Sequence, residues 1–172
     1  MTRSGESSFK TAFKNAKYWS NRGHWDWATN PNKRESPSFL KENILPIEES
    51  GQLHYLQKGG KSYLTKSDLG FEVLFVDGHT EKQMIPIVSY KGQKIAFSAD
   101  LIPTAGHIPL PYIMSYDVRP LVSMKEKELF LNFCHENNVF LFFEHDASVE
   151  LCSVKKTGRG VRLNEKLTLF DL

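Results

Sequence analysis

The chain has 172 residues, the length of one domain or of a large part of one. Its 40% hydrophobic and 12% aromatic content is typical of a globular protein and excludes a disordered one. The 22 basic and 20 acidic side chains leave a net charge of +2, too small to indicate a nucleic-acid partner. There is no apolar run of about eighteen residues and no signal-type apolar core near the start. We therefore expect a cytoplasmic protein with no membrane partner.

The two cysteines, Cys134 and Cys152, are far apart in sequence, and neither has metal-type spacing around it. We favour two buried, reduced thiols over a disulfide, because this is the usual state of cysteine in a cytoplasmic protein.

The first fifty-two residues read as helices and loops. The spacing of apolar residues predicts one helix over 9–16 and another from residue 38. Gly51 would end the second helix, and Pro46 would bend it or cut it short. Turn-forming residues predict a loop over 22–32. The two predicted helical faces are formed by Phe9, Phe13 and Ala16 and by Leu40, Ile44 and Ile47.

From residue 53 onward the pattern changes to strands. Short apolar runs predict strands at 53–57, 71–76, 84–90, 94–100 and 139–146, with two more within 148–156 and 162–170. The run at 139–146 is apolar on both faces, which indicates a central strand of a covered sheet.

Residues 123–138 are the clearest predicted helix. Ser123 and Glu126 form a capping box, and the predicted buried stripe consists of Leu129, Phe130, Phe133 and Cys134. Together with the strands, this helix indicates a mixed α/β (α+β) fold in which helices pack on sheets.

Three of the predicted strands end in residues that bind metals. The run at 71–76 leads to His79, the run at 94–100 to Asp100, and the run at 139–146 to His145. Two imidazoles and a carboxylate suit zinc or a similar divalent ion, and a carboxylate can bridge two metals. Each residue taken alone is more often a surface or hydrogen-bonded side chain than a ligand, but their recurrence at strand ends favours a site.

The order of three motifs resembles the C-terminal half of the metallo-β-lactamase-fold hydrolases. These motifs are DGHT at 77–80, FSADL at 97–101 and FEHDA at 143–147, within a similarity that runs from about 71 to 154. The stretch at 98–120 is similar to the branch that contains lactonase-like and organophosphate-hydrolase-like enzymes. Residues 24–54 are similar to the helical insert of that branch. The resemblance implies an αββα sandwich with a two-metal site at one edge.

The resemblance also implies roles for individual residues. His79 would bind the first zinc ion, Asp100 would bridge both ions and act in catalysis, and His145 would bind the second. His107 would contact a small-molecule ester, lactone or phosphoester, although it could equally be a loop residue that shapes the pocket wall. Independently of the resemblance, Tyr112 could line an apolar substrate pocket, although packing in the core or on the surface is the commoner role for such a residue. Ala99 stands where glycine is common in the family.

One departure from the family is large. The motif His-x-His-x-Asp-His, which supplies the remaining metal ligands, is absent, and no two histidines are two positions apart. We therefore expect 1–172 to be one partial domain, with an insert region at 1–52 and a ligand-bearing half at 53–172. This half would hold at most one zinc ion weakly and would be inactive alone. It would pair with an N-terminal half or a second copy of itself. The alternative is a catalytically inactive remnant or an interaction module.

Overall fold

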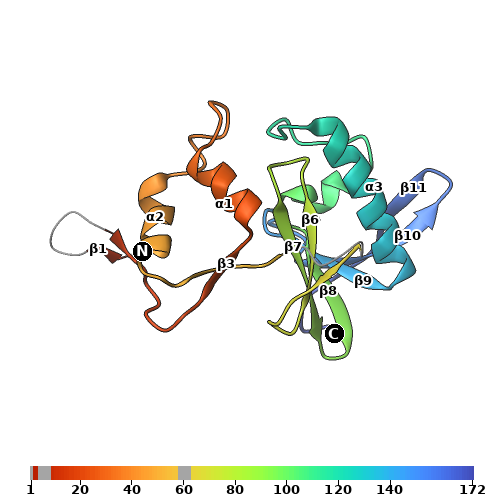
Figure 1. The fold of residues 1–172 in the computed structure, drawn as a ribbon. Coiled ribbons are helices and arrows are strands. Elements are labelled where there is room, and N and C mark those ends of the chain that lie inside the picture. Colours follow the sequence, from red (N-terminus) through yellow and green to blue (C-terminus); the bar gives the residue numbers. More distant parts are fainter. Residues whose placement is uncertain (1, 4–8, 58–62) are drawn as a thin grey trace. The chain divides into compact units, whose positions relative to one another are not determined.

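The computed structural model describes residues 2–3, 9–57 and 63–172 of the chain. It divides into two compact units, Met1–Lys58 and Gly59–Leu172, and each is described separately (Figure 1). Within the described residues, no helix combines the length and the apolar character needed to cross a membrane.

The first unit contains short strands and two helices. Strand β1 pairs with β2 in antiparallel fashion, and β3 pairs with β4 in parallel. The elements are β1 (Thr2–Arg3), β2 (Phe9–Lys10), β3 (Tyr18–Ser20), α1 (Arg22–Thr29), α2 (Lys41–Glu49) and β4 (Leu53–Tyr55).

The helix predicted over 9–16 is wrong. The segment begins as strand β2 and continues as turns, because the side chain of Gln52 binds its backbone. The Gln52 amide nitrogen donates to the carbonyl oxygens of Phe13, Lys14 and Ala16 at 2.9, 3.1 and 2.6 Å. Carbonyls satisfied in this way need no helical partners, so a contact far along the chain overrides the local pattern.

The loop predicted over 22–32 is also wrong, because it contains helix α1. Asn21 caps this helix, and its side-chain oxygen accepts the His24 backbone N–H at 2.8 Å. Trp25 and Ala28, three positions apart, form the buried side. The helix predicted from residue 38 is confirmed as α2, with Gly51 just after it at a φ of 73°.

The second unit is built on one large mixed sheet. Within the described residues it has seven strands in the order β11-β10-β9-β8-β7-β6-β5, and neighbours are antiparallel except β8 and β9. The strands are β5 (Thr65–Lys66), β6 (Glu72–Val76), β7 (Gln83–Tyr90), β8 (Gln93–Phe97), β9 (Val139–Phe142), β10 (Leu151–Thr157) and β11 (Gly160–Leu167). The strands predicted from residue 71 onward are therefore confirmed. The α/β class is confirmed as well.

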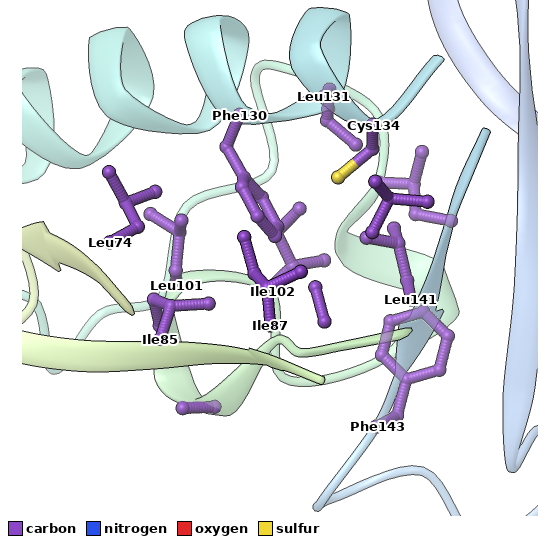
Figure 2. Packing of buried hydrophobic residues seen from close by; sticks show 14 of the residues in the cluster. Leu74, Ile85, Ile87, Leu101, Ile102, Phe130, Leu131, Cys134, Leu141 and Phe143 are labelled. Carbon is purple, nitrogen blue, oxygen red and sulfur yellow. The ribbon is translucent and has the colours of Figure 1, made fainter. Parts of the chain in front are cut away.

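Helix α3 (Pro120–Glu136) follows β8 and precedes β9 in the chain, and it packs on one face of this sheet (Figure 1). A helical crossover of this kind is what allows β8 and β9 to run parallel. Figure 2 shows Phe130, Leu131 and Cys134 of α3 pointing toward sheet residues such as Ile87 and Leu141. Phe130 is 0% exposed, and burying a side chain of this size contributes about 2–3 kcal/mol.

Two details of the predicted helix are wrong. The helix begins at Pro120, which suits a first-turn position, so Ser123 lies inside it and is not the cap. Glu126 does not complete a capping box, because it binds the loop after β6. Leu129 is 52% exposed, and Leu131 takes its place in the buried stripe.

Gly78 lies where the loop after β6 meets the first turns of α3. A Cβ built on Gly78 would collide with the backbone nitrogen and the hydroxyl oxygen of Ser123. The loop can approach α3 this closely because residue 78 has no side chain.

We expect Gly78→Ala to destabilise the protein by about 1–3 kcal/mol or more, because the collision involves helix backbone that cannot give way. Urea unfolding of the variant measures this. Gly158→Ala is the matched control, since a Cβ there meets nothing within 4 Å. Equal midpoints for the two variants would contradict the argument.

Candidate metal centre

Three of the strands that share one direction deliver the predicted ligands to one edge of the sheet. Strands β6 and β8 both pair antiparallel with β7, and β8 pairs in parallel with β9, so β6, β8 and β9 end at the same edge. His79, Asp100 and His145 each lie three residues beyond the end of one of these strands. Because Phe97 is paired with Phe142, Asp100 and His145 leave the sheet side by side.

The carboxylate of Asp100 lies between the two imidazoles. Its Oδ2 is 3.4 Å from Nε2 of His79, and its Oδ1 is 3.2 Å from Nε2 of His145. The structure thus brings together the three residues that the sequence singled out.

The turn that carries Asp100 has an unusual backbone. Ala99 adopts a φ of 43°, in the left-handed region that favours glycine. This conformation gives a physical reason why glycine is common at the position of Ala99 in the family that the sequence resembles. With alanine at this position, the left-handed backbone destabilises the folded state by about 1 kcal/mol relative to glycine.

Asp117 is a residue of the site that the sequence analysis missed. Its buried carboxylate oxygen Oδ1 lies 2.8 Å from Nδ1 of His79. A carboxylate can only accept, so Nδ1 carries a proton, and Nε2 is the ring nitrogen that faces Asp100. A lone Asp in a loop, far from His79 in sequence, gives no pattern that would have identified it.

The loop that carries His79 is tied by its backbone to the residues before α3. The N–H of Val118 donates to the His79 carbonyl at 3.2 Å, and the N–H of Arg119 donates to the Gly78 carbonyl at 2.9 Å. The Arg119 guanidinium also donates to the Asp77 carbonyl at 2.6 Å. His79 is therefore held from its backbone as well as from its ring.

His145 is the more accessible of the two imidazoles. Its side chain is 52% exposed, against 17% for His79. Its backbone N–H donates to the Pro103 carbonyl at 3.3 Å. Its neighbour Asp146 accepts the N–H of Ala105 at 2.9 Å, so two contacts hold the loop after β9 against the loop after β8.

The spacing of the donor atoms suits half of a two-metal ligand shell. Two ligand atoms on one tetrahedral zinc ion, each about 2.0–2.1 Å from it, lie about 3.3 Å apart. The His79–Asp100 and His145–Asp100 distances match that spacing. Each pair supplies two ligands, whereas a tetrahedral ion needs four. Consistent with this, the described residues contain no group of three or more His, Cys, Asp or Glu side chains placed to hold one ion.

A hollow of about 470 Å³ opens beside His145. His107 forms part of its wall, and Nδ1 of His107 lies 2.8 Å from the hydroxyl oxygen of Thr104. Burial lowers the pKa of His107, and the nearby charge of Lys127 lowers it further. Within the described part of the chain, Tyr112 is not one of the lining residues, and its side chain is exposed. The residues that line the hollow are Pro103, Thr104, His107, Ile113, Met114, Ser115, Tyr116 and His145.

Lys127 is a second residue that the sequence analysis missed. It is fully buried, and its ammonium donates to the carbonyls of His107, Pro109 and Tyr112 at 2.9, 3.1 and 2.8 Å. Burial lowers the pKa of Lys127 to about 8. A sequence signal for this residue existed, since Lys127 falls on the same helical face as Phe130, Leu131 and Cys134.

The remaining histidines are described by their own neighbours. His24 packs edge-on against Phe39 with ring centroids 5.7 Å apart, and His54 lies 5.0 Å from the ring of Trp19. His135 is in the last turn of α3. Both cysteines are buried, reduced thiols, which confirms that prediction.

No protein-family model matches the sequence, and no curated protein is significantly similar to it. Solved structures do match. One is a "probable metal-dependent hydrolase" from Staphylococcus aureus, with a TM-score of 0.70 and 22% identity over 91% of this chain. Another is AidC, a dizinc quorum-quenching lactonase, with a TM-score of 0.74 and 19% identity over 92% of this chain. A third is the hydrolase AbOPH of the β-lactamase superfamily, with a TM-score of 0.72 and 15% identity over 90% of this chain.

These structures are metallo-β-lactamase-fold hydrolases, so the chain has the metallo-β-lactamase fold over the part that it covers. The predicted resemblance is therefore confirmed at the level of fold. The chain spans 55%, 57% and 56% of the length of the three structures, which is just over half.

The lowered pKa of Lys127 predicts a pH dependence. Between pH 8 and about 10.5 the unfolded chain still binds the proton that the folded chain has released, so burial of this side chain costs less as the pH rises. We expect the stability of the wild type relative to Lys127→Met to increase with pH over that window.

Urea unfolding of both proteins at pH 7.0, 8.5 and 9.5 measures this difference. The buried thiols titrate in the opposite direction, but they are the same in both proteins and cancel. A difference that stays constant or shrinks as the pH rises would contradict the prediction.

Proposed function

We propose that this chain carries half of the catalytic site of a metal-dependent hydrolase. The observation that carries the proposal is the Asp100 carboxylate, which faces a different imidazole with each oxygen at ligand–ligand spacing. The similar solved structures support it, since one is a probable metal-dependent hydrolase and another is a dizinc lactonase.

In this proposal His79 would hold one zinc ion, His145 would hold a second, and Asp100 would be a ligand shared by both. The chemistry that such ions would supply when bound is activation of a water molecule and polarisation of the scissile bond. Asp117 keeps the His79 ring in the tautomer and orientation that present Nε2 to the site. The loop after β6, tied to Arg119, holds that ring in place.

The proposed substrate is a small ester, lactone or phosphoester. The hollow beside His145 supplies an apolar wall from Ile113 and Met114, and His107 contributes a polar atom to the same wall. We propose that His107 contacts the substrate or its leaving group. We also propose that Tyr112, whose side chain is exposed in the same loop, contacts the substrate. AidC was solved with the product N-hexanoyl-L-homoserine, an opened lactone, which supports this substrate class.

A second candidate function is that of an inactive remnant or an interaction module. The observation that favours it is the count of ligands, because His79, Asp100 and His145 give each ion two ligands of four. In either case we propose a cytoplasmic location, which suits the two reduced cysteines.

The expected partner is a polypeptide that supplies the other half of the fold. Residues alternate between the two faces of the sheet, so Leu74 and Ile85 face α3 while Phe75, Met84 and Phe140 face the opposite side. That opposite side is apolar as well, as it is in a sheet that is covered on both faces. We propose that an N-terminal half covers it in the complete enzyme, and that a second copy does so when that half is absent.

The metal proposal predicts weak zinc binding by the isolated chain. We expect at most one ion per chain after dialysis at neutral pH, because half a ligand shell is available. His79→Ala and His145→Ala should each weaken binding roughly tenfold or more. Calorimetric titration and metal analysis measure both quantities.

His135→Ala is the matched control, since it removes an imidazole from α3 outside the cluster and should leave binding unchanged. Equal zinc affinity in wild type, His79→Ala and His145→Ala would refute the proposed ligands. Two tightly held ions per chain would show that further residues complete the shell.

The partner proposal predicts self-association. Size-exclusion chromatography with light scattering at low micromolar concentration should show a dimer or a larger species, because apolar side chains exposed together on a sheet face favour association. Val88→Lys, at a position 38% exposed, should shift the protein toward monomer. A monomer that melts cooperatively and binds no apolar dye would rule out association.

A further inference from the structure

Helix α3 binds the loop after β6 through one carboxylate. Glu126 accepts two consecutive backbone N–H groups, that of Asp77 at 2.8 Å on Oε1 and that of Gly78 at 2.9 Å on Oε2. Burial raises the pKa of Glu126, and the two N–H groups act in the opposite direction by stabilising the ionised form. The bidentate contact fixes the start of the loop that carries His79.

The next residue of the same helix binds a different loop. All three protons of the Lys127 ammonium are used by carbonyls of 107–112, with no exposed surface left on the side chain. Adjacent helix residues point about 100° apart, so Glu126 and Lys127 leave α3 in different directions and reach different loops. One end of the bound segment is His107, on the wall of the hollow.

Stability alone does not explain a lysine at this position. Removing an ammonium from water costs several kcal/mol, and its three partners here are neutral carbonyls. A methionine would fill a similar volume without that cost, but it would leave the carbonyls of His107, Pro109 and Tyr112 without their donor. Unlike an apolar residue, Lys127 supplies one fixed donor group to three carbonyls of an irregular loop.

We propose that Glu126 and Lys127 are positioning residues, by which a single helix sets both the loop that carries His79 and the loop that carries His107. The two residues then have separable effects. Glu126 acts on the proposed metal ligand, whereas Lys127 acts on the wall of the hollow and leaves the ligands in place. The link to catalysis rests on the proposed function, but the positioning itself can be measured without any metal.

The test compares amide hydrogen exchange in Lys127→Met and in Lys125→Met, an exposed lysine of the same helix. In Lys127→Met the amides of Ile108 and Tyr112, which close turns within the loop, should exchange roughly tenfold faster. Exchange in β7 and β8 should be unchanged, and so should zinc affinity. Lys125→Met should match the wild type throughout.

Glu126→Gln, with Glu128→Gln as its exposed control, should give the reciprocal pattern. The amides of Asp77 and Gly78 should exchange faster, zinc should bind more weakly, and the 107–112 loop should be unaffected. If zinc fails to bind the wild type, the metal proposal fails, while the exchange measurements still decide the positioning.

A folded Lys127→Met with unchanged exchange in 107–112, or with equally faster exchange over the whole sheet, would overturn the inference. If that variant does not fold, a measurement on the wild-type protein tests the same inference. With ¹⁵N-labelled lysine, the ammonium protons of Lys127 should exchange slowly enough to give a resolved signal at neutral pH. The absence of that signal would overturn the inference as well.

Discussion

The site depends on the close packing of the loop after β6 against the first turns of α3. Because Gly78 has no side chain, the loop approaches Ser123 closely enough for Arg119 and Glu126 to bind its backbone. This packing aims His79, with one ring nitrogen against Asp117 and the other toward Asp100. The conformation of the loop after β6 is therefore set by its contacts with Arg119 and Glu126.

Strand direction accounts for the remainder of the geometry. Asp100 and His145 lie beside each other because β8 and β9 are parallel and in register at Phe97 and Phe142. The two donor pairs that result are each half of a tetrahedral shell, and the chain spans just over half the length of the structures it resembles. Under the proposed function, the remaining ligands would come from the polypeptide that is proposed to cover the second face of the sheet.

Much of this could be predicted from sequence where the pattern is local. The apolar runs at 71–76 and 139–146 gave strands because buried strands tolerate few polar residues, and the residues just beyond them marked the site. The helix predicted at 9–16 failed because Gln52, distant in sequence, occupies its carbonyls. Asp117 was missed because its partner, the ring of His79, is distant in sequence. Lys127 was missed although it falls on the buried face of α3, because its partners are loop carbonyls, which follow no period.

The crossover through α3 has a consequence for how the chain folds. Asp100 and His145 lie on opposite sides of that helix in sequence, so the pair cannot form until a long segment has closed and the parallel strands have paired. Contacts of such high sequence separation form slowly and late. In small zinc modules the ligands are neighbours in sequence, and the metal can organise the chain early. In this chain, by contrast, a metal would bind only after the strands have paired. Metal binding would then depend on completed folding and would not drive it.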